Sequence, residues 1–134
     1  MGHNILIADD HEDNRELLHL MLQSAGYSVR DAQNGSECLE IARAETPDLI
    51  MMDLSMPVLD GWRLFEELKL DQRTRRIPCV AVTAHADLDR RRALEKGFTA
   101  YISKPFATEH LLRTVASALT DRYEEEAPTT VESL

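Results

Sequence analysis

Carboxylates follow two short apolar runs of the sequence. Asp9 and Asp10 come directly after residues 5–8, and Asp53 comes after residues 49–52. A short apolar run of this kind is typical of a strand buried on both faces, and an acid at its end has no packing role. In open α/β sheets the carboxyl ends of the strands are where ligands bind. We therefore interpret Asp53 as an oxygen nucleophile that receives a phosphoryl group.

Two further predicted strands are followed by residues that suit the same chemistry. Thr83 follows residues 79–82, and Lys104 follows residues 100–103. Lys104 would supply a fixed positive charge, and the hydroxyl of Thr83 would hydrogen-bond a phosphoryl oxygen. A nucleophile, a cation and hydrogen-bond donors are the parts that phosphoryl transfer requires. An aspartate nucleophile would give an acyl phosphate.

Three carboxylates gathered at one edge of a sheet would repel one another. A divalent cation relieves that repulsion, which otherwise raises the proton affinity of the group. The candidate donors Asp9, Asp10 and Asp53 are all oxygen ligands, and no cysteine or histidine stands at metal-binding spacing. Such donors favour a hard ion, so Mg²⁺ or Mn²⁺ is expected. His11 is interpreted as a loop residue, and the other histidines as solvated surface.

The segments between the apolar runs show helical periodicity. Apolar residues recur at helical spacing in four of these segments, at Leu17, Leu18, Met21 and Leu22, at Leu39, Ile41 and Ala42, at Leu64, Phe65 and Leu68, and at Leu111, Leu112, Val115 and Leu119. Residues 87–96 also fit a helix, although that helix would bury little. Asp13 and Ser36 are expected to cap the first two helices.

The order of elements is strand then helix, five times over. Alternation of this kind predicts an α/β fold with a parallel sheet and helices on both faces. The natural topology is a single flavodoxin-like (βα)5 domain with a five-stranded sheet of order 2-1-3-4-5. We expect the domain to span residues 1–122. Residues 123–134 are acidic and lack an apolar stripe, which predicts a mobile tail.

These motifs together resemble a response-regulator receiver domain of two-component signalling. The resemblance covers about residues 4–119, and its motifs are Asp9-Asp10, D-x-x-M-P at Asp53, Asp60-Gly61, Thr83-Ala84 and Lys104-Pro105-Phe106. The family implies that Asp53 is the phospho-acceptor and that Thr83 and Lys104 contact the phosphoryl group. It also implies that the Lys104-Pro105 peptide bond is cis.

The resemblance implies further roles around the phosphoryl group. Asp10 would bind the metal directly together with Asp53 and the main-chain carbonyl of Ser55, and Asp9 would bind it through water. Thr83 would form a switch with Tyr101, which swings inward when Thr83 moves. Ser55 and His85 would tune the rate at which the acyl phosphate hydrolyses. The weakly buried helix at residues 87–96 would shift readily and form the output face with Tyr101.

The expected function is that of a single-domain response regulator. A histidine kinase or a histidine phosphotransfer protein would phosphorylate Asp53 in a Mg²⁺-dependent reaction, and a partner protein would read the resulting conformational change. The chain would catalyse only its own phosphorylation and dephosphorylation, with no organic cofactor, as a monomer or weak homodimer. Alternatives are a phosphorelay intermediate, a phosphate sink or a receiver cut from a hybrid kinase, although Met1 and the tail favour a complete chain.

Two other classes of protein fit the sequence less well. A phosphatase of the haloacid dehalogenase type would carry D-x-D after the first strand, where this chain has adjacent acids. A flavodoxin-like cofactor binder would need a phosphate-cradling loop there, and residues 9–13 are acidic and would repel a phosphate.

The composition of the chain limits the kinds of binding partner and the cellular compartment that it fits. The net charge of -9 over 134 residues argues against binding to nucleic acid or to an anionic membrane surface. No apolar run approaches the ~20 residues of a membrane-spanning helix, and the N-terminus lacks the features of a signal peptide. Cys38 and Cys79 lie within apolar patterns, which predicts reduced core thiols and a cytoplasmic location.

Overall fold

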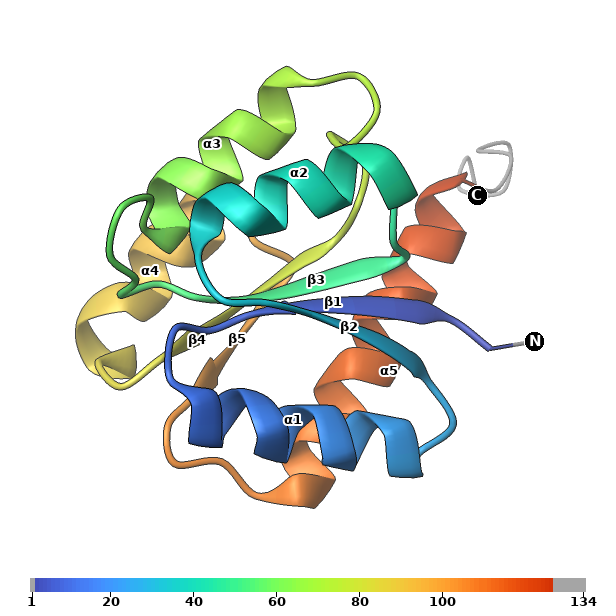
Figure 1. Ribbon diagram of the computed structural model, residues 1–134, viewed down its shortest axis with the longest axis vertical. Helices are drawn as coiled ribbons and strands as arrows, with labels where there is room; N and C mark the ends of the chain where they lie inside the picture. The colour runs from blue at the N-terminus through green and yellow to red at the C-terminus, as the bar shows by residue number, and fades with distance from the viewer. Residues whose placement is uncertain (1, 127–134) are drawn as a thin grey trace, which may run out of the picture.

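The structure is a computed structural model, and it describes residues 2–126. Within these residues five strands alternate with five helices (Figure 1). Their bounds are β1 Asn4–Ala8, α1 Glu12–Ser24, β2 Ser28–Ala32, α2 Gly35–Glu45, β3 Leu49–Asp53, α3 Gly61–Leu70, β4 Cys79–Thr83, α4 Ala86–Lys96, β5 Ala100–Ser103 and α5 Thr108–Glu126. The predicted alternation is confirmed, including the weak second strand.

The five strands form one parallel sheet in the order β2-β1-β3-β4-β5, as predicted. Figure 1 shows α2, α3 and α4 on one face of the sheet and α1 and α5 on the other. The register pairs Ala8 with Met52 and Asp53 with Val82. The residues that follow β1 and β3 therefore emerge side by side at one edge of the sheet.

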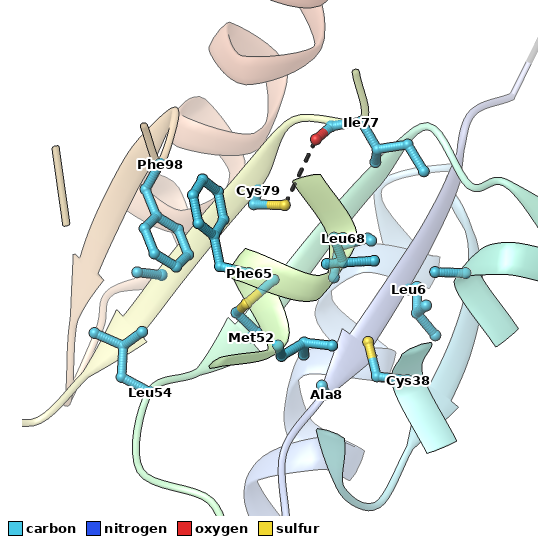
Figure 2. Packing of buried hydrophobic residues seen from close by; sticks show 14 of the residues in the cluster. Leu6, Ala8, Cys38, Met52, Leu54, Phe65, Leu68, Ile77, Cys79 and Phe98 are labelled. Atoms are coloured by element: carbon cyan, nitrogen blue, oxygen red, sulfur yellow. Dashed lines mark hydrogen bonds between the residues drawn. The ribbon is translucent and has the colours of Figure 1, made fainter. Parts of the chain in front are cut away.

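Burial is deepest in β3 and β4, where every residue is buried. The apolar residues of the sheet divide between two clusters, one on each face, because successive strand residues point to opposite sides. In the cluster under α2, α3 and α4, Phe65 stacks on Phe98 and Met52 lies beneath (Figure 2). A central strand packed on both faces is rigid, which suits a strand that must hold a reactive side chain.

Cys38 and Cys79 lie in this same cluster, and both are free, buried thiols (Figure 2). Burial raises the pKa of both thiols, that of Cys79 to about 12. The prediction of two reduced core thiols is confirmed.

Two of the predicted helix caps are not the residues that cap these helices in the structure. The first helix begins at Glu12, one residue before Asp13, and no side-chain cap is formed by His11 in the described part of the chain. The second helix is capped by Asn34, whose side chain accepts the N–H of Glu37 at 2.8 Å, and not by Ser36. Both predictions were wrong because the chain enters each helix two residues earlier than the predicted cap.

A close approach of backbones holds the start of α3 against the end of β3. Asp60 caps α3 by accepting the N–H of Arg63 at 2.9 Å. A Cβ atom on Gly61 would lie 2.7 Å from the carbonyl oxygen of Asp53 and 2.8 Å from the Cα of Leu54. Only glycine therefore fits at this junction.

The last helix continues to Glu126, four residues into the segment for which a tail is predicted. The rest of that segment, residues 127–134, lies outside the described residues, so the domain boundary stays a prediction. Within residues 2–126, no helix has both the length and the apolar character needed to cross a membrane.

Candidate functional site

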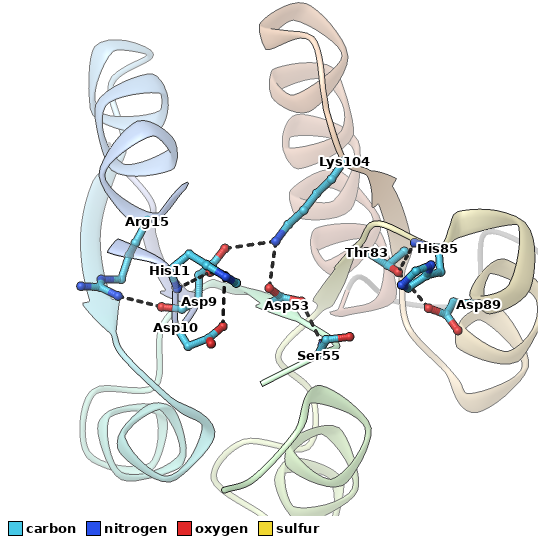
Figure 3. A network of polar contacts seen from close by, with 10 residues as sticks. All are labelled: Asp9, Asp10, His11, Arg15, Asp53, Ser55, Thr83, His85, Asp89 and Lys104. Carbon is cyan, nitrogen blue, oxygen red and sulfur yellow. Dashed lines mark hydrogen bonds and ion pairs between the residues drawn. The ribbon is translucent and has the colours of Figure 1, made fainter. Parts of the chain in front are cut away.

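Four of the predicted site residues meet at the carboxyl edge of the sheet (Figure 3). Asp9 and Asp10 follow β1, Asp53 is the last residue of β3, and Lys104 follows β5. Asp9 is 1% exposed and Asp53 is 4% exposed. Buried ionisable side chains need partners, so this arrangement requires a specific set of contacts.

Lys104 reaches across the sheet edge to both buried acids. Its Nζ lies 2.8 Å from Oδ2 of Asp53 and 3.6 Å from Oδ2 of Asp9. Burial by itself lowers the pKa of Lys104, but the contacts with the two carboxylates outweigh it, and the pKa is raised. Lys104 is therefore held as a cation. The Lys104-Pro105 peptide bond is cis, as the resemblance implied.

The carboxylate of Asp53 is held by both of its oxygens. Oδ2 accepts from the ammonium of Lys104, and Oδ1 accepts the backbone N–H of Ser55 at 2.9 Å. Two charge-assisted contacts orient a carboxylate more strongly than neutral hydrogen bonds do. These two contacts therefore hold the Asp53 carboxylate in one orientation.

The acids also form a cluster with the geometry of a cation site. One donor atom from each of Asp9, Asp10, His11 and Asp53 can be chosen so that all lie within 4.8 Å of one another. Among the described residues, Oδ2 of Asp9 and Oδ1 of Asp10 are buried and accept no hydrogen bond. A buried carboxylate oxygen without a hydrogen bond is costly, and a divalent ion with oxygen ligands relieves that cost. The residues present therefore fit a hard divalent cation.

The electrostatics of Asp9 agree with this interpretation. Burial raises the pKa of its carboxyl group, and the neighbouring charge of Asp53 acts in the same direction. The backbone N–H of His11, which donates to Oδ1 at 2.9 Å, and the ammonium of Lys104 oppose the shift. The net shift is upward, so the protein alone does not fully stabilise the negative charge of Asp9.

Thr83 lies at the same sheet edge but faces another partner. Its hydroxyl donates to Oδ2 of Asp89 in α4 at 2.8 Å and accepts the backbone N–H of His85 at 2.9 Å (Figure 3). Tyr101 in β5 is half-buried, with the guanidinium of Arg90 5.5 Å from its ring centroid. Both proposed switch residues therefore contact α4.

Two residues of the site were not predicted from the sequence. Asp89 receives the Thr83 hydroxyl, and its only sequence signal is an acid in the first turn of a helix. His11 was interpreted as a loop residue, although it directly follows the acidic pair and its ring lies beside both acids. The remaining site predictions, Ser55 as a carbonyl ligand and His85 as a rate-tuning residue, are placed beside Asp53 and Thr83 without a test of their roles.

The fold and the site together define a class of protein. A parallel α/β sheet of order 2-1-3-4-5, with three carboxylates and a lysine at one edge, suits a protein that accepts a phosphoryl group on an aspartate beside a bound cation. Residues 5–116 match the family model described as the response regulator receiver domain, and the chain belongs to that family.

This chain is similar to known proteins and to solved structures over nearly its whole length. The polar-differentiation response regulator DivK of Brucella anthropi is 38% identical over 90% of this chain and 99% of the relative. The receiver domain of the sensor histidine kinase PA1611 from Pseudomonas aeruginosa, with magnesium coordinated in its active site cleft, is 33% identical at a TM-score of 0.83, covering 90% of this chain and 99% of that one. The chemotaxis protein CheY4 of Vibrio cholerae is 28% identical at a TM-score of 0.82, covering 88% and 99%.

Family membership confirms the resemblance found in the sequence, and with it the predicted fold and general function. The chain is a receiver domain of two-component signalling, which accepts a phosphoryl group on an aspartate and passes the signal on by a change of conformation. Proteins of this kind interact with kinases or phosphotransfer proteins and with downstream targets.

Proposed function

We propose that Asp53 is the phosphoryl acceptor and that the surrounding residues serve its phosphorylation. The observation that carries this proposal is the 2.8 Å contact between Lys104 Nζ and Asp53 Oδ2, beside two buried carboxylate oxygens that accept no hydrogen bond from the described residues. The contact positions the carboxylate for attack and places a cation where it can bind an incoming phosphoryl oxygen. The chain is not an enzyme toward other molecules and catalyses only its own phosphorylation and dephosphorylation.

The proposed metal is Mg²⁺, with Mn²⁺ as the alternative. Asp10 and Asp53 would hold it directly, together with the main-chain carbonyl of Ser55, and Asp9 would hold it through water. When bound, the ion supplies positive charge that offsets the negative charge of the carboxylates and the phosphoryl group. The donor set and the magnesium in the PA1611 receiver support this assignment.

The proposed donor is a histidine kinase or a histidine phosphotransfer protein, and the proposed output is contact with a downstream protein. The match to DivK over 99% of that relative's length supports a single-domain regulator. The two free, buried cysteines suit the reducing cytoplasm, where we place the chain. A monomer or weak homodimer, and the absence of a nucleic-acid or membrane partner, stay predictions.

The proposed function is tested with a small acyl-phosphate donor. With Mg²⁺ present, the intact mass of the chain is expected to rise by one phosphoryl group. Removal of the metal with a chelator is expected to prevent this gain, because the charges of donor and carboxylates are then not offset. Mass spectrometry of the intact protein measures both. A gain that is equally large without any divalent ion would contradict the proposed metal site.

The contact of Thr83 with Asp89 makes a second prediction. To bind a phosphoryl oxygen, the Thr83 hydroxyl must leave Asp89, and a hydrogen bond to a charged group contributes roughly 1.5–3 kcal/mol. Asp89→Ala removes that competitor. A phosphoryl mimic is then expected to bind about tenfold tighter, which corresponds to about 1.4 kcal/mol.

The matched control is Asp87→Ala, which removes a second acid from the first turn of α4. Its affinity for the mimic, measured by calorimetry, is expected to stay near that of the wild type. Equal tightening in both variants would mean that charge, and not the Thr83 contact, governs the affinity. Ser55 and His85 stay predicted rate-tuning residues, and phosphoryl lifetimes of variants at these two positions test that role.

A further inference from the structure

Arg15 links the first turn of α1 to the peptide bond between the two acids that follow β1. The residue is half-buried, and its Nη1 donates to the main-chain carbonyl of Asp9 at 2.8 Å (Figure 3). The backbone N–H of Arg15 donates to the carbonyl of His11 at 3.0 Å. Two hydrogen bonds from one residue therefore enclose the turn that carries the acid pair.

The partner of this guanidinium distinguishes it from an ordinary surface arginine. Acids lie close to Arg15 in α1, at Glu12, Asp13 and Glu16, yet among the described residues the guanidinium forms no ion pair with any of them. Its charge is directed to a carbonyl, so the carboxylate oxygens of the acid pair stay available to a cation. A contact with backbone instead of with a neighbouring charge indicates a role in the shape of the turn.

The Asp9 carbonyl belongs to the peptide unit that joins the two acids. A peptide unit is planar, so a contact that fixes the direction of this carbonyl also fixes the N–H and the Cα of Asp10. Asp9 is held on its other side by the sheet, where its N–H donates to the carbonyl of Ala32 at 3.2 Å. Asp10 lies beyond the last residue of β1, and its buried Oδ1 accepts no hydrogen bond from the described residues. The direction of the Asp10 side chain therefore depends on the peptide plane that Arg15 holds.

A role as a substitute helix cap does not explain the contact. Within the described residues, His11 gives α1 no side-chain cap. The groups that a cap satisfies are the free N–H donors of the first turn, and they need an acceptor. The guanidinium of Arg15 is a donor, and its partner lies outside the helix, in the residue after β1.

We propose that Arg15 is a positioning residue for phosphorylation, which holds the peptide plane between Asp9 and Asp10 so that both carboxylates face Asp53. Charges that are already oriented need no rearrangement when the reactants bind. Without the guanidinium, a bound ion would have to order the turn itself, and that cost would weaken its affinity. This inference rests on the proposed function and adds to it a residue from outside the acidic cluster.

The test compares the wild type with Arg15→Ala and Arg15→Lys in calorimetric titrations with MgCl₂. Arg15→Ala is expected to bind Mg²⁺ about tenfold more weakly, at the lower end of the effects seen for residues that orient metal ligands. Arg15→Lys is expected to recover most of the affinity, because the Asp9 carbonyl accepts from a single nitrogen of Arg15. The matched control is Arg30→Ala, which removes an exposed arginine of β2 paired with Glu45 at 3.0 Å and is expected to bind Mg²⁺ as the wild type does.

A kinetic measurement separates positioning from a general loss of stability. The rate of phosphorylation by a small acyl-phosphate donor is measured over a range of Mg²⁺ concentrations, at a temperature where each variant is folded. Arg15→Ala is expected to need about tenfold more Mg²⁺ for its half-maximal rate. Its maximal rate is expected to approach that of the wild type, because the bound ion then holds both acids. A lower maximal rate at an unchanged Mg²⁺ requirement would overturn the proposal.

Hydrogen exchange measures the order of the turn without any metal. The backbone N–H of His11 donates to Oδ1 of Asp9 at 2.9 Å, and its exchange in the presence of a chelator is followed by nuclear magnetic resonance. Exchange is expected to be faster in Arg15→Ala and unchanged in Arg30→Ala. Wild-type exchange and wild-type Mg²⁺ affinity in Arg15→Ala would overturn the role of Arg15 and leave the proposed function intact. A wild type that neither binds Mg²⁺ nor gains a phosphoryl group would overturn both.

Discussion

The Asp53→Asn variant is expected to gain no phosphoryl group when it is incubated with Mg²⁺ and an acyl-phosphate donor. The change keeps the shape of the side chain but replaces the ionised carboxylate with a neutral amide, which is not a nucleophile toward phosphorus. It also removes the negative charge that Lys104 contacts at 2.8 Å. Intact-mass spectrometry before and after incubation measures the outcome.

The matched control is Asp31→Asn, which makes the same change at a half-buried acid of β2. Asp31 contacts His19 at 2.8 Å and lies outside the acidic cluster, so its variant is expected to gain mass as the wild type does. Loss of phosphorylation in both variants would indicate a general effect on folding. A full mass gain in Asp53→Asn would show that another side chain, with Asp9 and Asp10 the nearest candidates, is the acceptor.

The position of Asp53 could be predicted because two features of the sequence, the apolar run before it and the alternation of strands and helices, lead to the same conclusion. The apolar run before it is typical of a strand buried on both faces, and all five residues of β3 are buried. The alternation of strand and helix predicts a parallel sheet, in which all carboxyl ends lie at one edge. Residues far apart in the sequence, such as Asp9 and Lys104, are then brought together by topology alone.

The partners of these side chains could not be predicted in the same way. Thr83 was expected to face the phosphoryl group, but its hydroxyl contacts Asp89, six residues further along the chain. His11 was set aside because one histidine beside two acids carries no metal-binding pattern. Such contacts depend on rotamers and on where α1 and α4 begin, and element boundaries are the least certain part of a sequence-based prediction.

The same limit explains the cap of α2. Asn34 and Ser36 are both good capping residues, and periodicity alone does not decide between them. In the structure the carbonyl of Asn34 accepts the N–H of Cys38 and its side chain accepts that of Glu37. The close backbone contact that requires glycine at position 61 could not be predicted either, because such a contact has no pattern in the sequence.

The Gly61→Ala variant is expected to be destabilised by about 1–3 kcal/mol, the range typical of overpacking. The added methyl group would lie 2.7 Å from the carbonyl oxygen of Asp53 and 2.8 Å from the Cα of Leu54. Both atoms belong to the backbone, so the conflict is relieved only if α3 or the end of β3 moves. Urea unfolding followed by circular dichroism measures the loss.

The position of the clash also predicts a functional defect. Because β3 ends at Asp53, a shift of its backbone would disturb the 2.9 Å hydrogen bond from Ser55 and the contact with Lys104. Slower phosphorylation at temperatures where the variant is still folded is therefore expected. The control is Gly2→Ala, where the new Cβ would meet its nearest atom at an ordinary 3.5 Å. If Gly61→Ala is as stable and as readily phosphorylated as that control, close packing of α3 against β3 does not position Asp53.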